Sequence, residues 1–396
     1  MDTQEMDNLI IHPPVPVTLL PKSDKLNITA LSRLFNNTTN SYKFLFFISL
    51  LDILVRRKFD VQEPISFDEL TIEMLANAWF PHTFFKLSFG TQDTIAKKLD
   101  SLVINVEEPV FKFRDADKKL LRKAISLAEL GNANRLMEYV PYRLLVPFLE
   151  TEMCNVDKGK WMVLESALPS IANSNFKIKH PLYKFDSDNY KDCKNIYFNS
   201  LWCEYIKEHY SIIYGWTSWN WLQYMQKRNP STPGISNKLF MPVKRDSLTK
   251  QTSYWKKILD ENNGTPIRCI YSGTPLKVGN FSLDHYLPWS FVAHDQLWNL
   301  IPTLPSVNSC KSNNLPDERY FNTFIQMQYD GLLIAKQIFS QHEFDKQTEH
   351  FIADLALKET TDLLEFEKLQ DAYKRTISPL TLLAINQGFT KGWHYN

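Results

Sequence analysis

Hydrophobic residues recur at helical spacing along most of the chain, and this pattern predicts a mainly α-helical protein. The strongest run covers residues 42–57, where apolar side chains fall on more than one face and indicate a core helix. A Ser-Phe-Asp-Glu capping box at 66–69 predicts the start of a helix that reaches Trp79. Shorter helices are expected over 27–35, 92–102, 115–130 and 133–137.

The middle of the chain follows the helical pattern less regularly. Residues 139–149 fit either a helix or a strand, and residues 150–195 predict loops and short strands, including one at 176–179. Two aromatic helices are expected next, over 197–214 and 217–228. Their large side chains are expected to form a packed hinge against the following module rather than a base-stacking surface: Trp216, Trp219, Trp221 and Tyr224.

Residues 229–234, Asn-Pro-Ser-Thr-Pro-Gly, form the clearest break in the chain. Helical spacing returns after Pro316 and predicts helices over 318–339, 343–374 and 379–387, a tail that would pack on the helical body or on a second copy. We therefore expect a mainly α protein with a small α+β module, in four parts: a helical domain at 1–190, an aromatic connector at 191–236, the α+β module at 237–325 and a helical extension at 326–396.

The formal net charge of +1 means that any nucleic-acid surface has to be a local patch. Between residues 238 and 260 six lysines and arginines stand against two aspartates. Lys244, Arg245, Lys256 and Lys257 are therefore candidates for contacts with backbone phosphates. An ordinary solvated helix face is the alternative.

Cysteine usage and the chain start bear on the compartment. The five cysteines are scattered and odd in number, which favours a reducing environment. The opening Met1-Asp2-Thr3-Gln4-Glu5 is acidic and polar, unlike a signal peptide. The most apolar run, 44–55, contains Asp52 and is too short to span a bilayer. We expect a cytoplasmic protein that does not associate with membranes.

The candidate chemistry lies in one short segment. Asp284 and His285 are adjacent, Asn299 follows fourteen residues after the histidine, and Asn308 follows nine residues later. A carboxylate beside an imidazole can hold a divalent cation while the imidazole takes a proton from water. An asparagine carbonyl can complete an oxygen-rich site that suits Mg²⁺ or Mn²⁺. Asn299 lies in an apolar run that predicts a short buried strand, where its side chain is expected to bond to backbone across the loop.

Helix signals follow this strand. Thr303 can cap a helix, Pro305 suits its first turn, and Pro316 lies beyond its end. Asn308 then falls near mid-helix, where asparagine is mildly unfavourable, so a functional role is the better interpretation. Lys311 lies one turn further on the same face and is a candidate phosphate contact, with a merely solvated lysine as the alternative.

The segment from Cys269 to Pro316 resembles an HNH (ββα-metal) nuclease domain, with spacing similar to the HNH domain of the type II CRISPR effector nuclease. The resemblance implies that His285 is the general base, that Asp284 and Asn308 hold one Mg²⁺ or Mn²⁺ ion, and that Asn299 braces the loop. The last family position is more often histidine, so this H-N-N variant is expected to prefer neither nickel nor zinc.

Many HNH domains hold a structural zinc with two Cys-x-x-Cys pairs, of which only Cys269 and Cys310 remain here. Two thiols cannot close a tetrahedral site, so no structural zinc is expected and packing has to hold this knuckle.

The leading hypothesis is a metal-dependent endonuclease that nicks or cleaves DNA, although the site alone does not separate DNA from RNA. The alternative is an inert HNH scaffold that binds nucleic acid or a partner protein. The approach to the motif resembles bacterial HNH proteins of defence or mobile-element settings, which implies a role against foreign DNA. The chain shows no Gly-rich phosphate loop or helicase motif, so an energy-consuming step would require a partner protein. Partner proteins and a homo-oligomer both stay open.

Overall fold

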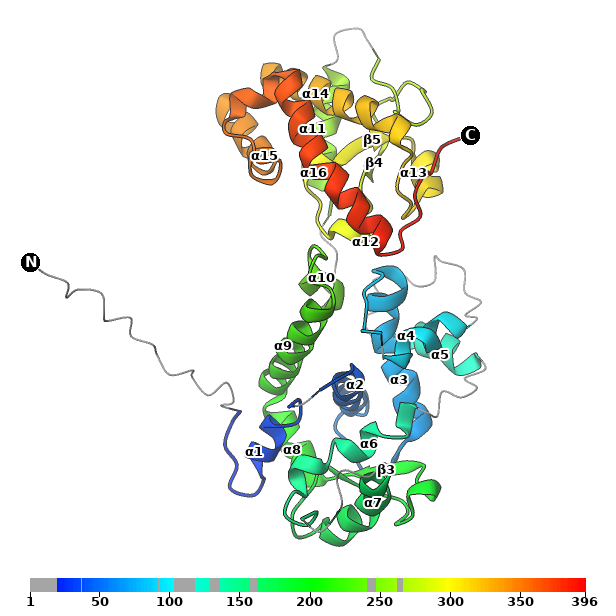
Figure 1. Cartoon of the computed structure of the whole chain (residues 1–396). Coiled ribbons are helices and arrows are strands. Elements are labelled where there is room, and N and C mark those ends of the chain that lie inside the picture. The colour runs from blue at the N-terminus through cyan, green and yellow to red at the C-terminus, as the bar shows by residue number, and fades with distance from the viewer. Residues whose placement is uncertain are drawn as a thin grey trace, which may run out of the picture. The chain divides into compact units, whose positions relative to one another are not determined.

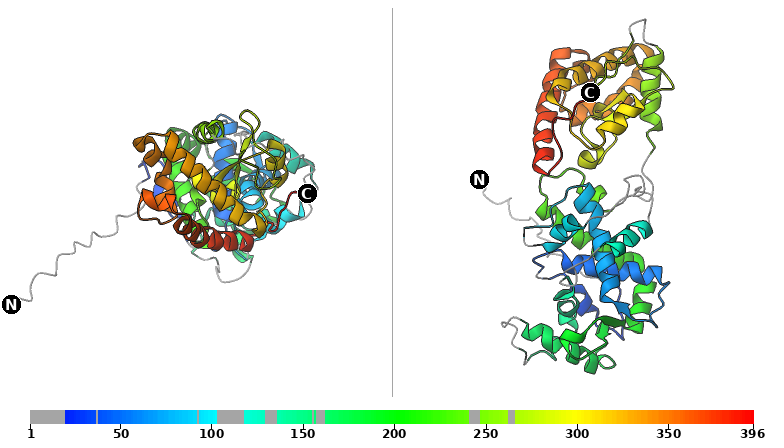
Figure 2. Two further views of the ribbon diagram at one scale, coloured as in Figure 1. Left: turned by 90° about the horizontal axis from the view of Figure 1, so that it is seen from above. Right: turned by 90° about the vertical axis from the view of Figure 1, so that its right-hand side faces the viewer.

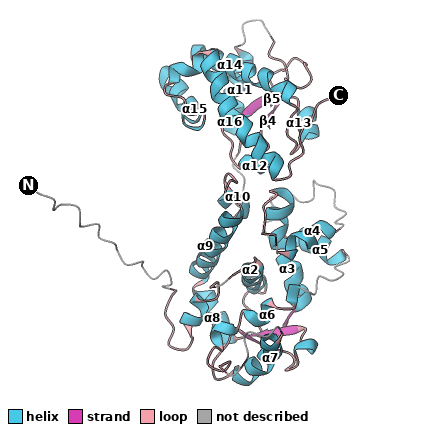
Figure 3. Cartoon of the chain, in the orientation of Figure 1, coloured by secondary structure: helices cyan, strands magenta, loops and turns pink. Residues whose placement is uncertain are grey.

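Helices dominate the chain, as the hydrophobic spacing predicts (Figure 3). The computed structural model describes residues 20–36, 38–91, 93–102, 118–128, 136–154, 156, 162–240, 247–261 and 266–396. The described residues fall into two compact units. Unit 1 contains residues 20–78, 89–102 and 118–224, and unit 2 contains residues 79–88 and 225–396, each with the gaps just given. Of the expected boundaries, 190 lies inside unit 1, and 236 and 325 lie inside unit 2.

Unit 1 confirms the helices expected over 27–35, 42–57, 92–102 and 115–130, with shorter bounds, whereas 133–137 lies mostly outside the described residues. Its helices are α1 (Ile28–Ser32), α2 (Tyr42–Arg56), α3 (Phe67–Trp79), α4 (Thr94–Ser101), α5 (Lys119–Leu127), α6 (Val140–Arg143), η4 (Val146–Phe148), α7 (Val163–Asn175), η5 (Tyr190–Asp192), α8 (Ser200–Glu208) and most of α9 (Tyr210–Arg228).

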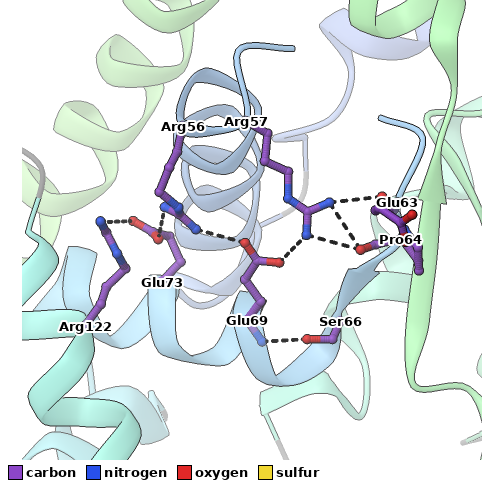
Figure 4. Close-up of polar contacts among 8 residues, drawn as sticks. All are labelled: Arg56, Arg57, Glu63, Pro64, Ser66, Glu69, Glu73 and Arg122. Atoms are coloured by element: carbon purple, nitrogen blue, oxygen red, sulfur yellow. Dashed lines mark hydrogen bonds and ion pairs between the residues drawn. The ribbon is translucent and has the colours of Figure 1, made fainter. Parts of the chain in front are cut away.

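Helix α2 is the expected core helix, with ten of its fifteen side chains buried. Its last turn is joined to α3 by ion pairs (Figure 4): Arg56 binds Glu73 at 2.6 Å, and Arg57 binds Glu69 at 2.6 Å. Ser66 Oγ accepts the Glu69 N–H at 3.0 Å, as the capping box predicts. The Glu69 carboxylate binds Arg56 and Arg57, so the glutamate side chain of the predicted capping box stabilises the packing of α2 on α3.

A three-stranded antiparallel sheet completes unit 1, in the order β1 (Ile65–Ser66), β3 (Asn195–Phe198), β2 (Tyr183–Phe185). The strand expected at 176–179 is wrong, because these residues form a turn after α7. Most of the helix expected over 197–214 is present as α8 and the start of α9, but its expected first residues belong to β3 and the break between the two helices lies at residue 209. Residues 195–198 alternate between half-buried and buried side chains, and this period of two belongs to a strand.

The middle of unit 1 is more helical than its sequence pattern indicates. Residues 139–149 contain α6 and η4, which confirms the helical one of the two alternatives, and the stretch 150–195, expected to hold loops and short strands, also contains α7. The aromatic side chains of α9 differ in their surroundings. Trp216 and Trp221 pack within unit 1, with ring centroids 4.8 Å from Phe35 and 5.6 Å from Phe44, while Trp219 is 53% exposed.

Unit 2 contains the candidate site (Figures 1 and 2). Its elements are η1 (Phe80–Phe84), α10 (Ile235–Leu239), α11 (Thr249–Asp260), β4 (Ser282–His285), α12 (Trp289–Val292), η6 (Leu297–Asn299), β5 (Leu300–Thr303), α13 (Pro305–Lys311), η7 (Glu318–Tyr320), α14 (Phe321–Ile338), α15 (Gln341–Asp354), η8 (Thr360–Leu364) and α16 (Phe366–Asn386).

Helices α11 and α14 pack on the strand pair β4–β5 and share one hydrophobic core with it. The Trp255 indole and the Gln328 amide both donate to the Leu300 carbonyl, at 3.1 and 2.9 Å. Gly331 of α14 permits this close packing, because a Cβ there would lie 2.9 Å from the Trp255 ring. The C-terminal tail therefore packs on the strand module, a partner that neither expectation named.

The C-terminal helices differ from those expected at 343–374 and 379–387. Helix α15 ends at Asp354, η8 follows, and α16 runs from Phe366 to Asn386 through Pro379. Among the residues that the structure describes, no helix is long and apolar enough to cross a membrane.

Candidate active site

Strands β4 and β5 and helix α13 form a ββα arrangement. The strands are antiparallel, and the last two residues of β4, Asp284 and His285, lie opposite Ile301 and Leu300. All four residues of β5 are buried, as the apolar run predicts. Helix α13 follows β5 and packs on β4, so its side chains reach the end of β4 that carries the Asp-His pair.

The start of α13 differs from the expected one in a single residue. Pro305 occupies the first turn as predicted, but Leu304 is the residue before the helix. Thr303 belongs to β5, where its Oγ1 lies 2.9 Å from Cys269 Sγ and cannot cap the helix.

Asp284 is 2% exposed and both of its carboxylate oxygens are bonded. Oδ2 accepts the Tyr271 hydroxyl at 2.7 Å, and Oδ1 accepts the Lys311 ammonium at 3.0 Å. Burial and the nearby Asp284 charge raise the pKa of Tyr271 well above its usual value, so its hydroxyl stays a donor. This pairing satisfies both oxygens of a buried carboxyl group.

Lys311 is completely buried and also donates to the His285 carbonyl at 2.6 Å. In this structure the Lys311 ammonium lies inside the site. The expectation that it contacts a phosphate and the alternative that it is solvated are therefore both wrong. Its position on the Asn308 face of α13 is confirmed, since both side chains bond to β4.

His285 is 9% exposed, and its Nε2 lies 2.8 Å from Asp295 Oδ1. Asp295 comes from the segment between α12 and η6. Next to an ionised carboxylate, Nε2 carries the hydrogen, so the neutral ring has its lone pair on Nδ1. The neighbouring His294 is neutral at pH 7, because burial lowers its pKa to about 4.

Asn299 makes the bonds expected of a loop brace. Its side chain is completely buried, Oδ1 accepts the Leu287 N–H at 2.9 Å, and Nδ2 donates to the Leu287 carbonyl at 2.9 Å. The Asn299 carbonyl also accepts the Tyr286 N–H at 2.9 Å. These bonds fix the two residues that follow His285.

Asn308 donates through Nδ2 to Ser282 Oγ at 3.1 Å and to the Leu283 carbonyl at 2.9 Å, which directs its Oδ1 away from β4. Carboxylate and amide oxygens from Asp284 and Asn308 fit Mg²⁺ or Mn²⁺ in donor type. Within the described chain no cluster of three or more His, Cys, Asp or Glu side chains could hold a metal. Two protein oxygens suit an ion that keeps most of its waters, provided that Lys311 releases Asp284.

The basic segment before the motif divides into three groups. Lys244 and Arg245 lie outside the described residues. Lys256 and Lys257 are exposed on α11, and Lys257 Nζ lies 4.8 Å from the centre of the Phe339 ring. Lys238 is completely buried and donates to the Phe291 carbonyl, and burial lowers its pKa to about 7. Lys238 therefore cannot belong to a phosphate-binding surface.

The knuckle before β4 is held by backbone bonds and by packing. Gly273 N–H donates to the Cys269 carbonyl and Cys269 N–H to the Thr274 carbonyl, both at 2.9 Å. Tyr271 packs edge-on against Tyr320 and Trp393, with ring centroids 5.0 and 5.1 Å away. Cys269 is buried and Cys310 is exposed.

Sequence reasoning missed three residues of this site: Tyr271, His294 and Asp295. The only sequence signal for Asp295 is weak: it is a carboxylate ten residues after the histidine, in the loop that Asn299 braces. Nothing in the sequence distinguishes Tyr271 or His294 from other core residues.

Residues 269–317 match the family model of HNH endonucleases. The match contains Asp284, His285, Asn299 and Asn308, and it indicates a nuclease that acts on nucleic acid. It does not distinguish the variant found in the type II CRISPR effector. No curated protein and no solved structure matches the chain.

Proposed function

We propose that the protein is a metal-dependent endonuclease that hydrolyses DNA phosphodiester bonds. The observation that carries the proposal is the pairing of His285 Nε2 with Asp295, next to Asp284 on a ββα frame that α13 closes. A base that is fixed in one tautomer beside a carboxylate suited to a cation is the arrangement that water attack on phosphorus requires.

His285 takes the proton of the attacking water at Nδ1 in this mechanism, while Asp295 holds the ring through Nε2. Asn299 keeps the following loop in place, so that the ring keeps its orientation. Asp284 and Asn308 are the residues that would hold Mg²⁺ or Mn²⁺. When bound, the ion supplies positive charge for the oxygen that leaves. Each site performs one hydrolysis, so single-strand nicking is the elementary reaction.

DNA would approach over the exposed side of α11. Hydroxyl side chains and one lysine line a depression of about 470 Å³ at the start of this helix: Ser247, Thr249, Thr252, Ser253 and Lys256. Hydroxyls and lysines are common partners of backbone phosphates. Together with Lys257, Lys244 and Arg245 they make the proposed DNA surface.

One observation favours a second candidate, an HNH scaffold that binds nucleic acid without cutting it. Both oxygens of Asp284 are already bonded, to Tyr271 and to Lys311. If Lys311 never releases this carboxylate, the site cannot take an ion.

A plasmid assay separates the two candidates. Supercoiled DNA is incubated with the wild-type protein in Mg²⁺, Mn²⁺ or EDTA, beside His285→Ala and the control His342→Ala, which changes an exposed histidine of the same unit. We expect nicking by the wild type and the control in either metal, and none by His285→Ala or in EDTA. DNA binding without nicking in every metal arm would support the inert scaffold.

The defence role rests on resemblance alone and has its own test. Cells that carry the wild-type gene should plate phage or take up plasmid less efficiently than cells that carry His285→Ala. Equal efficiencies would remove defence from the proposal without affecting the nuclease assay.

A further inference from the structure

Unit 1 contains a cavity of about 420 Å³ for which the nuclease has no use. It lies where α1 contacts η4 and α2 contacts α6. Polar side chains from the α1–α2 loop line one part of it, and apolar side chains from α6, η4 and α7 line another. The cavity is therefore built for a ligand with both a polar and an apolar part.

Three cations line this cavity: Arg33, Lys43 and Arg143. The arginines have carboxylate partners, since Arg33 binds Glu150 at 2.9 Å and Arg143 binds the buried Glu165 at 2.5 Å. Lys43 makes no hydrogen bond or ion pair with any residue that the structure describes. Partial burial and the Arg143 charge both lower the pKa of Lys43. Among the described residues, no carboxylate therefore pairs with Lys43.

The start of α2 is already occupied. Helix α2 begins at this cavity with Tyr42 and Lys43, and the buried Asp93 carboxylate accepts the Ser41 N–H at 2.8 Å. An anionic ligand therefore has to be held by side chains of the cavity, and not by the helix start.

The cavity walls suggest which anion fits. Tyr139 carries the Arg143 guanidinium over its ring at 4.9 Å, and Val140, Val146 and Pro147 add apolar surface. A planar apolar group can lie on this wall while an anionic group meets Lys43. A volume of about 420 Å³ holds a molecule of nucleoside monophosphate size.

We propose that this cavity binds a small phosphorylated ligand of the nucleoside monophosphate class, with its phosphate against Lys43 and Arg33, which both line the cavity. The ligand would make unit 1 a sensor that is separate from the chemistry of unit 2. The proposal does not depend on nuclease activity, because it concerns binding alone.

Isothermal titration of the full-length protein in EDTA tests the proposal without cleavage. The probes are AMP, GMP, CMP, UMP, inorganic phosphate and adenosine. We expect at least one monophosphate to bind with one site per chain, phosphate to bind more weakly, and adenosine to bind at least tenfold more weakly than AMP. If none of the four monophosphates binds at concentrations up to about 5 mM, any affinity is weaker than that of usual ligand sites, and the proposal is overturned.

Charge variants of Lys43 make the test specific to the cavity. Lys43→Met should weaken monophosphate binding about tenfold or more, because a charged hydrogen bond to phosphate is lost. Lys43→Arg keeps the charge and should retain binding, as should the control Lys97→Met, which changes an exposed lysine of unit 1. Circular dichroism checks that each variant is folded.

Thermal melting gives a second readout. Monophosphate should raise the melting temperature of the wild type and of Lys97→Met, but not of Lys43→Met. Equal binding or equal thermal shifts in Lys43→Met would show that the cavity cations serve only packing. Binding confined to 5′-phosphorylated oligonucleotides would assign the site to nucleic-acid ends and would overturn a small ligand.

Discussion

The charge of Asp284 depends on two side chains that are distant in sequence. Tyr271 and Lys311 bond one oxygen each, and all three residues are nearly or fully buried. A buried carboxylate is stable only while it is paired, so these partners hold the site together without an ion. An incoming cation then competes with the Lys311 ammonium for the same oxygen.

Lys311→Met tests this competition. Removing one partner of a buried pair should lower the free energy of unfolding by about 3–5 kcal/mol in EDTA. Mg²⁺ or Mn²⁺ should then raise the melting temperature of the variant more than that of the wild type, because Asp284 has no competing ammonium. Lys256→Met, an exposed control, should behave as the wild type does. Equal metal shifts in Lys311→Met and the wild type would mean that Asp284 does not bind the ion.

Asp295→Asn tests the positioning of His285. An amide oxygen can still accept the Nε2 hydrogen but brings no charge, so cleavage should fall by about tenfold, whereas Asp295→Ala should fall further. The acidic limb of the pH–rate profile should move to lower pH in Asp295→Asn, since a carboxylate favours the protonated imidazole. A merely structural Asp295 would leave the shape of that profile unchanged.

For single residues, the sequence predicts those contacts that depend on residues nearby in the chain. The Asn299 brace follows from an apolar run and a loop of twelve residues. The burial of Lys311 does not, because it depends on a pairing across 27 positions with Asp284. Helical spacing places Lys311 correctly on its face but cannot tell whether that face meets solvent or β4.

Among the elements, α10 is held to α12 by a buried lysine. Lys238 donates to the Phe291 carbonyl, and its ammonium lies 5.4 Å from the centre of the Phe291 ring. Burial lowers its pKa to about 7 from an ordinary 10.5. Since the folded protein binds this proton less tightly than the unfolded chain does, the stability linked to Lys238 is complete above pH 10.5 and is lost as the pH falls towards 7.

Lys238→Met should therefore be more stable than the wild type at pH 7, and the difference should shrink towards pH 10. The slope should reach at most about 1.4 kcal/mol per pH unit. Urea denaturation at four pH values between 7 and 10 measures it. A difference that stays constant with pH would show that the Lys238 charge is not the cause.

The exposed side of α11 gives the binding prediction. In a His285→Ala background, neutralising Lys256 and Lys257 should weaken binding to all DNA sequences alike. The slope of log affinity against log salt should become shallower by about 0.9 per lost contact. Neutralising Lys244 and Arg245 extends the series, and Lys346→Met on α15 is the control. An unchanged slope would show that the exposed side of α11 is an ordinary solvated helix face that does not contact DNA.

Element prediction succeeded where the hydrophobic period is strong and failed where tertiary contacts decide. Helix α2 is evident because most of its residues are apolar. Helix α7 has no side-chain cap and contains Pro169, so no local signal reveals it. Pro379 misled in the same way, because α16 continues through it with buried residues on both sides.

At the scale of the whole molecule, the sequence located the nuclease segment but not its surroundings. The motif spacing identifies the segment from Cys269 to Pro316, and the match of residues 269–317 to the family model of HNH endonucleases supports it. That α14 and α16 share a core with β4 and β5 depends on contacts across dozens of residues, such as the Tyr373 hydroxyl that donates to the Trp298 carbonyl at 2.9 Å. Hydrophobic periodicity shows that these helices have apolar faces. It does not show which element packs on each face.

Single-turnover cleavage measures directly whether His285 activates water in a metal-dependent nuclease. With protein in excess over labelled duplex DNA in Mg²⁺, the rate constant of His285→Ala should fall by about 10²–10⁴ relative to the wild type, because general-base catalysis is lost. The affinity for DNA, measured in parallel by fluorescence anisotropy in EDTA, should stay the same. A rate constant equal to that of the wild type would contradict the account.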